Sequence, residues 1–270
     1  GNVGRRFDVR WLRSDFASFM LIGIVNRLDR DDQVGGCGEI RLVYRLVYRQ
    51  EREDGSVASS PMPLTINAKL RPSSEDCRSV VRSWASAPED PTERADWLMA
   101  GPLSPDALEP SHFELNVQAV RLPSGVAWNF AGQAVYLLRA DEILTNGDAV
   151  SVRALPLENT PDVTRIAADP ALRRELVEWI DSHHHEIDRG LHLLPDRFLA
   201  TEALSWSTLG IHRVANKPFQ ALLSPDELRT PEPGDWVRGT EALLERLDNA
   251  TCMGCHQAGS TAGFHFLGRG

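Results

Sequence analysis

The first half of the chain contains segments in which apolar and polar residues alternate. In the segment 39–49, every second residue is apolar and most of the residues between are charged; the apolar set is Ile40, Leu42, Tyr44, Leu46 and Tyr48. A period of two is the pattern of a β-strand with one apolar face. Similar alternation occurs at 64–70 and 113–119, and the segments 134–139 and 149–155 are predicted as further strands. We therefore expect an antiparallel sheet with one face exposed to water.

Turn sequences separate these segments, and the strongest is Asn146-Gly147 between two apolar runs. Helical spacing appears at 76–87 and again at 92–99, directly after Pro91. The segment 16–28 fits a buried strand and a helix equally, so its assignment stays open. Together these patterns predict a β-rich domain over residues 1–160 that contains two inserted helices.

The pattern changes to a helical period after about residue 161. Asp169 and Pro170 form a suitable helix start, and apolar residues at helical spacing predict a helix over 170–190. A second helix is predicted at 196–206. A last helix should begin near Thr240 and run directly into Cys252. The expected fold class is therefore α+β, with a β-rich antiparallel N-terminal part and a mainly helical region over 161–270.

Composition narrows the classes of partner. The 270 residues are 42% hydrophobic, so the chain can bury a sizeable core, and the formal net charge is −9. Nucleic acid and anionic membranes require a basic surface, so we expect neither as the main partner. No run of 18 apolar residues is present, which argues against a membrane span in this chain.

The four cysteines fall into two groups. Cys37 and Cys77 stand alone in the first third of the chain, whereas Cys252 and Cys255 have the spacing C-x-x-C. An even count with one distant pair favours a Cys37–Cys77 disulfide in an oxidising compartment. The alternative is a pair of buried thiols that pack as small hydrophobic side chains.

Cys252-Met253-Gly254-Cys255-His256 is the motif with the clearest chemistry. In C-x-x-C-H, the two thiols form thioethers with the vinyl groups of haem, and on a helix positions i and i+3 share one face. The histidine that follows can bind the iron through its imidazole. The chain has no second C-x-x-C that would complete a four-cysteine zinc site.

The residues Leu-Asp-Asn-Ala-Thr-Cys-Met-Gly-Cys-His-Gln at 247–257 resemble the start of a c-type cytochrome domain, over about residues 240–268 only. The resemblance implies a cytochrome-c-like haem helix, with haem c attached to Cys252 and Cys255 and its iron bound by His256. It implies one-electron transfer to a redox partner protein, or a place in a larger assembly, and an electron carrier rather than a catalyst. The expected location is the periplasm, the extracellular space or the cell surface.

The second protein ligand of the iron is open at this point. Only 14 residues follow His256, so we expect the natural chain to continue beyond Gly270; otherwise earlier helices complete the haem pocket. His265 is a candidate for this ligand or for a hydrogen bond in the loop. The densest group of histidines is His183, His184, His185 and His192, which is typical of a polar helix end. This region could alternatively supply the ligand, or a second metal site that uses His185 with Glu186 or His192.

Two other classes of function compete with electron transfer. A haem-dependent oxidase or peroxidase would need an open position on the iron. A non-haem structural or binding module would use C-x-x-C-H as a disulfide or as part of a zinc site. The sequence contains no G-x-S-x-G, P-loop, G-x-G-x-x-G or H-E-x-x-H pattern, so hydrolase and nucleotide-binding classes have no support.

Overall fold

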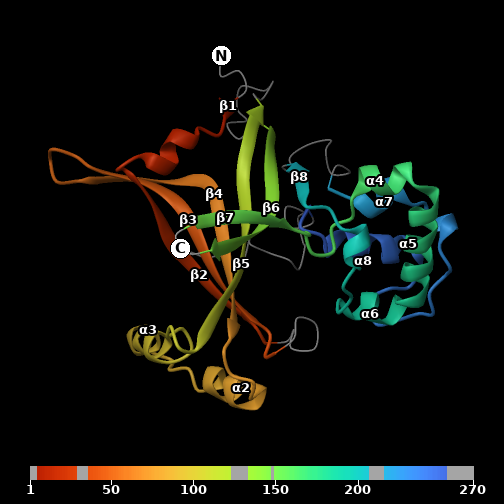
Figure 1. The fold of residues 1–270 in the computed structure, drawn as a ribbon, viewed down its shortest axis with the longest axis horizontal. Helices are drawn as coiled ribbons and strands as arrows, with labels where there is room; N and C mark the ends of the chain where they lie inside the picture. The colour runs from red at the N-terminus through yellow and green to blue at the C-terminus, as the bar shows by residue number, and fades with distance from the viewer. Residues whose placement is uncertain (1–4, 29–35, 123–132, 147–148, 207–215, 254–270) are drawn as a thin grey trace. The chain divides into compact units, whose positions relative to one another are not determined.

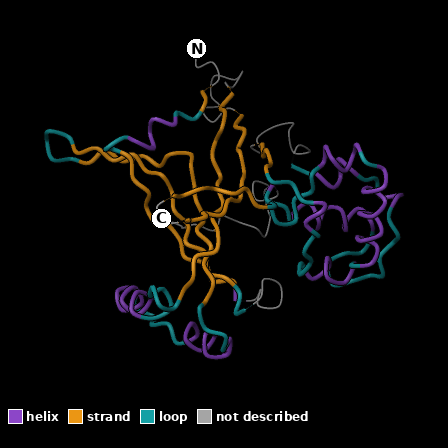
Figure 2. The backbone as a smooth tube through the Cα atoms, viewed as in Figure 1, coloured by secondary structure: helices purple, strands orange, loops and turns teal. Residues whose placement is uncertain are grey.

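The protein is an α+β protein, with antiparallel strands in its N-terminal part and helices in its C-terminal part (Figure 1, Figure 2). The computed structural model describes residues 5–28, 36–122, 133–146, 149–206 and 216–253. The chain divides into two compact units. We call them the strand unit (10–115 and 141–153) and the helical unit (1–9, 116–140 and 154–270). This confirms the predicted fold class.

The strands pair in the order β2-β3-β4-β5-β6-β7, and in addition β1 pairs with β5 and β8 with β6. The β2–β3, β3–β4 and β6–β8 pairs are antiparallel. All five segments predicted as strands form strands. The bounds are β1 Arg5–Arg6, β2 Ala17–Arg27, β3 Glu39–Glu51, β4 Val57–Pro72, β5 Leu108–Leu122, β6 Gln133–Asn146, β7 Ala149–Leu155 and β8 Glu202–Trp206.

The segment that fitted both a strand and a helix forms β2. Its register with β3 extends from Ala17 opposite Tyr48 to Arg27 opposite Glu39, with one irregularity between Leu21 and Gly23. This pairing gives the backbone of an aromatic and β-branched run its hydrogen-bond partners, which decides in favour of the strand.

Two helices interrupt the strand unit, as predicted. They are α2, Cys77–Ala85, and α3, Pro91–Ala100. An aspartate caps each start: Asp76 accepts a hydrogen bond from the Ser79 amide, and Asp90 accepts from the amides of Thr92 and Glu93. The rings of Trp84 and Trp97 meet edge to face at 6.0 Å between their centroids. A short 3₁₀ helix, η1, occupies Val9–Arg13.

The predicted disulfide between Cys37 and Cys77 is confirmed. It joins the residue two before β3 to the first residue of α2, with 4.8 Å between the two Cα atoms. Because 40 residues of sequence separate the two cysteines, the bond closes a long loop that contains β3 and β4.

The expectation of one fully wetted sheet face is wrong in the strand unit, because charged side chains on that face are buried. Lys69 is 4% exposed, Glu39 5% and Asn67 4%. The Lys69 ammonium lies 2.6 Å from a Glu114 carboxylate oxygen and 3.7 Å from Glu39, which also pairs with Arg41. These ion pairs, and a 3.2 Å hydrogen bond from Asn67 to Glu114, compensate the charges for the loss of water.

The charge of Lys69 also governs the ionisation of Glu114. Burial alone would raise the pKa of this carboxyl, but the nearby ammonium of Lys69 and the guanidinium of Arg41 lower it to about 2. On the same strand, burial lowers the pKa of His112, and the positive charge of Lys69 lowers it further. The cluster therefore holds an ionised carboxylate at neutral pH.

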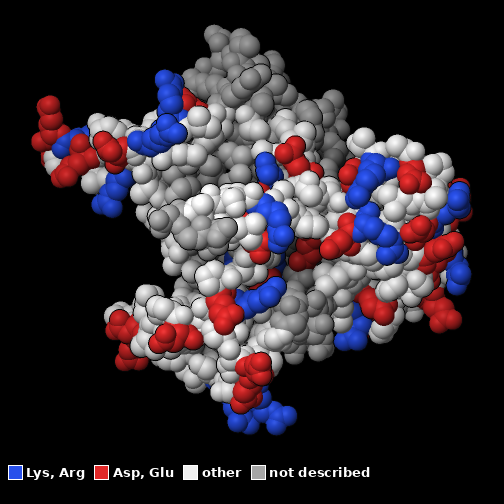
Figure 3. Space-filling model, viewed as in Figure 1, with Lys and Arg blue, Asp and Glu red and all other residues white. Residues whose placement is uncertain are grey.

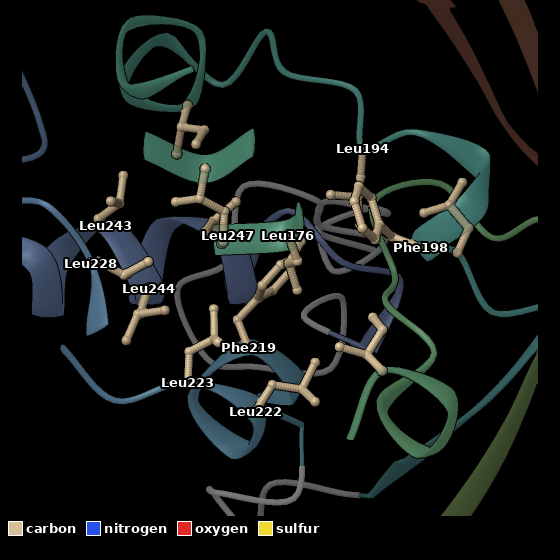
Figure 4. Close-up of a cluster of buried hydrophobic side chains, with 14 of the residues drawn as sticks. Leu176, Leu194, Phe198, Phe219, Leu222, Leu223, Leu228, Leu243, Leu244 and Leu247 are labelled. Carbon is tan, nitrogen blue, oxygen red and sulfur yellow. The ribbon is translucent and has the colours of Figure 1, made fainter. Parts of the chain in front are cut away.

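The helices of the helical unit surround one apolar core (Figure 4). Phe198 and Phe219 are almost fully buried there, together with Leu176, Leu243 and Leu247. Helix α8 contacts α6 and α7, and α4 contacts α5 and α7. The bounds are α4 Val163–Ala168, α5 Pro170–Ser182, α6 His184–Arg189, η3 Asp196–Phe198, α7 Pro218–Leu222, η5 Pro225–Glu227 and α8 Thr240–Asn249.

Two helix predictions need correction. The helix expected at 170–190 is divided at His183, which ends α5 and precedes α6. The helix expected at 196–206 is wrong: only the three residues of η3 are helical, and Glu202–Trp206 form strand β8. Residues 202–206 pair with β6, from Arg139 opposite Glu202 to Val135 opposite Trp206, and this pairing overrides the local helix propensity.

The surface carries charges of both signs. Over the helices α4–α8, acidic and basic side chains are intermingled on the face that Figure 3 shows. Within the described ranges, no helix has the length and apolar character needed to cross a membrane.

Candidate functional site

Helix α8 leads to the first cysteine of the C-x-x-C-H motif. Its residues Leu243, Leu244 and Leu247 are buried in the apolar core, which fixes the helix in place. The helix ends at Asn249, not at Cys252 as predicted. The Ala250 amide bonds to the carbonyls of Arg246 and Leu247, and both the amide and the hydroxyl of Thr251 bond to the Asp248 carbonyl. A short turn thus separates the helix from Cys252.

Cys252 is held by residues from a distant part of the chain. Its amide donates to Oγ1 of Thr160 at 2.9 Å, and its Sγ lies 3.8 Å from the carbonyl oxygen of Glu158. Cys252 and Met253 are partly buried against an apolar cluster of Leu138, Ala140, Leu157 and Ala203. The first thiol of the motif therefore occupies a fixed position between polar backbone groups and apolar side chains.

The residues that hold Cys252 belong to a buried turn at 157–161, between β7 and α4. The Thr160 amide bonds to the Leu157 carbonyl, and Thr160 is 1% exposed. Two further bonds, from the Leu157 amide to the Ala200 carbonyl and from the Ala200 amide to the Thr160 carbonyl, fix the turn against the segment before β8. Asn159 has a left-handed backbone with φ of 53°, a conformation that asparagine tolerates better than most residues.

The same turn fixes His192. The Asn159 side chain donates to the His192 carbonyl at 3.2 Å and accepts from the Leu194 amide at 2.8 Å. The His192 side chain is buried, with the residue 4% exposed, and neither of its ring nitrogens has a hydrogen-bond partner in the described part of the chain. Burial lowers the pKa of this imidazole to about 4, and the Arg246 guanidinium contributes in the same direction. The ring is therefore neutral at physiological pH.

The neighbouring histidines have different environments. The His183 ring stacks on Trp179 with 4.4 Å between centroids, and its Nδ1 lies 2.7 Å from the Trp179 carbonyl oxygen. Nε2 of His184 lies 3.7 Å from the Asp181 carboxylate. His185 is exposed on α6. Among the described residues, Nε2 of His184 also lacks a hydrogen-bond partner, but His184 is only partly buried. His192 differs from the triplet in its deep burial and in the lack of a partner at both ring nitrogens.

Asp248, on the buried side of α8, is a titratable group that sequence reasoning missed. It is 0% exposed, and its Oδ1 accepts a 2.7 Å hydrogen bond from the Phe219 amide at the start of α7. Its Oδ2 has no partner among the described residues. Burial raises the pKa of Asp248 to about 7, although hydrogen bonds from Phe219 and Gln220, and the charge of Lys217, oppose this rise. The sequence did contain a signal, because Asp248 follows Leu244 by four positions and so lies on the apolar face of the helix.

The structure places part of the predicted site. Cys252 lies as described above, whereas Cys255, His256 and His265 lie outside the described residues. Within the described ranges, no group of three or more His, Cys, Asp or Glu side chains is arranged to hold a metal ion. The described residues therefore provide no ligand set for the second metal site that was considered at His185 with Glu186 or His192.

Comparison of the chain with protein-family models, with curated proteins and with solved structures found no match. Any function must therefore be argued from the motif and from the residues that surround it.

Proposed function

We propose that the protein is a c-type haem protein that transfers single electrons outside the cytoplasm. The observation that carries this proposal is the C-x-x-C-H sequence, whose first cysteine lies one short turn after a packed helix and is fixed by Thr160. The thioether bonds would form at Cys252 and Cys255, and His256 would bind the iron. When bound, the haem supplies an iron that gains and loses one electron.

The surroundings of Cys252 are suited to a covalently attached macrocycle. Its sulfur lies beside an apolar cluster that includes Leu138 and Leu157, and an apolar environment of this kind excludes water from a haem edge. The buried turn at 157–161 is far from Cys252 in the sequence, but its Thr160 hydroxyl accepts from the Cys252 amide and so holds the backbone of the cysteine. The unpartnered ring nitrogens of His192, attached to the same turn, add a donor with the chemistry that iron prefers.

The Cys37–Cys77 disulfide is compatible with an oxidising compartment, so we place the protein in the periplasm, outside the cell or at the cell surface. The partner in this proposal is a redox protein. The strand unit could dock this partner or position the haem within an assembly.

The test is a pyridine haemochrome spectrum of the full chain, produced in a host with a haem-maturation system. We expect a reduced α band that remains after acid-acetone extraction, because thioether bonds retain the haem. Cys252→Ala together with Cys255→Ala should lose all of this signal. Met253→Leu, a substitution within the motif that leaves both thiols in place, is the matched control and should keep it.

Other outcomes separate the competing classes. A wild-type protein without haem under these conditions refutes the proposal and directs attention to zinc content and thiol titration. Covalent haem that is high-spin and binds cyanide or peroxide readily would instead favour an oxidase or peroxidase with an open iron position.

A further inference from the structure

Strand β2 lies at one end of the strand order, and its outer side pairs with no strand among the described residues (Figure 1). An edge of this kind presents backbone N–H and C=O groups that can bind another strand. Natural proteins usually protect such edges with charged residues or proline. Residues 16–26 contain neither, so this edge lacks the usual protection.

The side chains of β2 are apolar and exposed on both faces of the sheet. Phe19 and Leu21 point to one face and Met20 points to the other, because the side chains of a strand alternate. All three are between 42% and 45% exposed. A continuous apolar edge is typical of a surface that another molecule covers.

The apolar surface continues beyond the start of β2. The ring of the exposed Phe16 lies 6.1 Å from the Tyr48 ring of β3, measured between centroids. Trp11 of η1 meets the same Tyr48 ring edge to face at 5.4 Å, and its neighbour Leu12 is also exposed. Tyr48 thus holds Phe16 and η1 beside the strand, which enlarges the surface that a partner would cover.

The charges at the two ends of β2 indicate which partner fits. Asp15 precedes the strand, Arg27 ends it, and no charged residue lies between them. They are 12 positions apart, about 40 Å in an extended chain, so they cannot pair within one copy. A second copy that runs antiparallel brings each Asp15 to the Arg27 end of the other copy, whereas a parallel copy would place like charges together.

The backbone of β2 also fits an antiparallel copy. The Arg49 amide donates to the Phe16 carbonyl, so Phe16 and every second residue after it direct their backbone to β3. The residues between them, such as Ala17 and Phe19, direct their N–H and C=O groups outward. The register irregularity between Leu21 and Gly23 shifts this alternation by one position.

Beyond the irregularity, Val25 and Arg27 lie opposite Arg41 and Glu39, so they direct their backbone to β3. The residues with outward backbone groups are then Ile24 and Asn26. A two-fold axis between residues 21 and 22 places Ala17 of one copy opposite Asn26 of the other, and Phe19 opposite Ile24. Outward groups thus meet outward groups along both halves of the strand, as an interface between identical surfaces requires. Arg27 then lies opposite Phe16, directly beside Asp15.

We propose that β2 is the contact surface of a homodimer, in which the β2 strands of two copies pair antiparallel and join the two sheets. Addition of a strand to an exposed sheet edge is a common mode of recognition, because main-chain hydrogen bonds supply affinity. This inference goes beyond the proposed function and does not rest on it, since all of the residues concerned belong to the strand unit.

The experiment is sedimentation velocity of the full chain at several concentrations. We expect the wild type to form a species with twice the mass of one chain. Leu21→Lys places a charge on the edge and should yield a monomer. Val152→Lys is the matched control, because Val152 is an exposed apolar residue of β7, the strand at the other end of the order, where the charged Arg153 protects the edge. This control should stay dimeric.

Two charge variants test the antiparallel orientation. Asp15→Arg and Arg27→Asp each turn two symmetry-related attractions into repulsions, so each should raise the Kd of the dimer about tenfold. The double variant restores opposite charges and should return the Kd close to the wild-type value. Because the two residues of one chain are too far apart to meet, this rescue can only arise from contact between copies.

A wild type that stays monomeric at the highest soluble concentration overturns the inference. Equal weakening of the dimer by Leu21→Lys and Val152→Lys overturns it too, and so does a double charge variant that associates no better than the single variants. Circular dichroism of each variant separates loss of association from loss of fold. If Leu21→Lys does not fold, the charge variants still decide, since a misfolded single variant would not be rescued by the second charge change.

Discussion

Asn159 connects two parts of the candidate site through a single side chain. Its amide group bonds to the His192 carbonyl and the Leu194 amide, and its left-handed backbone turns the chain so that Thr160 can meet Cys252. Few residues other than asparagine combine a tolerated positive φ with both a donor and an acceptor. The geometry of the site therefore depends on this residue although it carries no reactive group.

Replacing Asn159 should test this dependence. We expect Asn159→Ala to lower the free energy of unfolding by about 2–4 kcal/mol, because it removes two buried hydrogen bonds and places a side chain with a Cβ at positive φ. Asn159→Gly keeps the backbone conformation and loses only the hydrogen bonds, so it should lose less. Urea unfolding followed by circular dichroism measures the free energy of unfolding of both variants. Equal losses in the two would show that the positive φ at this position adds nothing to the cost of Asn159→Ala.

Asp248 should give the protein a measurable pH dependence. Its pKa is raised to about 7, whereas an unfolded chain has an aspartate pKa of about 4. Between these two values the folded protein holds a proton that the unfolded chain has released, so stability falls as the pH rises through this window. We expect this single group to remove about 2–4 kcal/mol between pH 4 and pH 7.

The matched variant for this effect is Asp248→Asn. Its amide oxygen can still accept from Phe219, and it cannot ionise, so the part of the pH dependence that Asp248 causes should disappear. The difference in unfolding free energy between the two proteins, measured at several pH values, isolates this group from all others. A difference that does not change with pH would show that Asp248 is ionised in the folded protein.

Of the described site, the sequence predicted Cys252 and named His192 among its candidate histidines, and it missed Asn159, Thr160 and Asp248 for identifiable reasons. Cys252 was predicted because C-x-x-C-H is a local motif with a fixed chemical purpose. The burial of His192 could have been inferred from Leu193 and Leu194, which follow it and are partly and almost fully buried. Its lack of a hydrogen-bond partner, and its link to Cys252 through Asn159, depend on contacts between residues far apart in the chain.

At the scale of elements, alternation predicted the strands because the side chains of a strand point to opposite faces at every second residue. The prediction failed at 202–206, where glutamate, alanine and leucine favour a helix locally but the backbone pairs with β6. It also assigned the polar positions of β3 and β4 to solvent. Sequence periodicity cannot show that Lys69 and Glu39 are buried, since a charged residue in a strand is usually exposed.

The charged cluster between β4 and β5 should make the strand unit sensitive to acid. Glu114 has a pKa of about 2 in the folded protein, below its value in an unfolded chain of about 4.3, so it stabilises the fold above that value. The stabilisation is lost as the pH falls toward 2. We expect Glu114→Gln to lower the free energy of unfolding at pH 7 by about 2–3 kcal/mol, and this difference to vanish near pH 2.

Lys69 offers a check that does not depend on titration of Glu114. Lys69→Ala removes the ammonium that lies 2.6 Å from Glu114 and leaves two carboxylates without it, so we expect a loss of about 3–5 kcal/mol at pH 7. Replacement of the exposed Arg153, which pairs with Glu142 at the surface, is the matched control and should cost less than about 1 kcal/mol. Losses of equal size in the two variants would show that the burial of Lys69 does not increase the contribution of its ion pairs to stability.

At the scale of the whole molecule, the two pairs of cysteines belong to separate units. The disulfide lies in the strand unit, and the C-x-x-C-H motif belongs to the helical unit. The four thiols could in principle exchange partners during oxidation. The fold argues against exchange, because the two Cα atoms of Cys37 and Cys77 are only 4.8 Å apart and Cys252 is fixed by Thr160.

Replacing Cys37 and Cys77 together by serine should therefore reduce stability without removing haem. A bond between residues separated by 40 positions restricts the unfolded chain enough to contribute about 4 kcal/mol, so the urea midpoint should fall accordingly. Hydrogen exchange should show the loss in the amides of β3 and β4, which the closed loop contains. The pyridine haemochrome signal per protein should match the wild type, since the proposed haem bonds use Cys252 and Cys255. A folded variant that has lost its haem would show instead that the disulfide contributes to haem attachment.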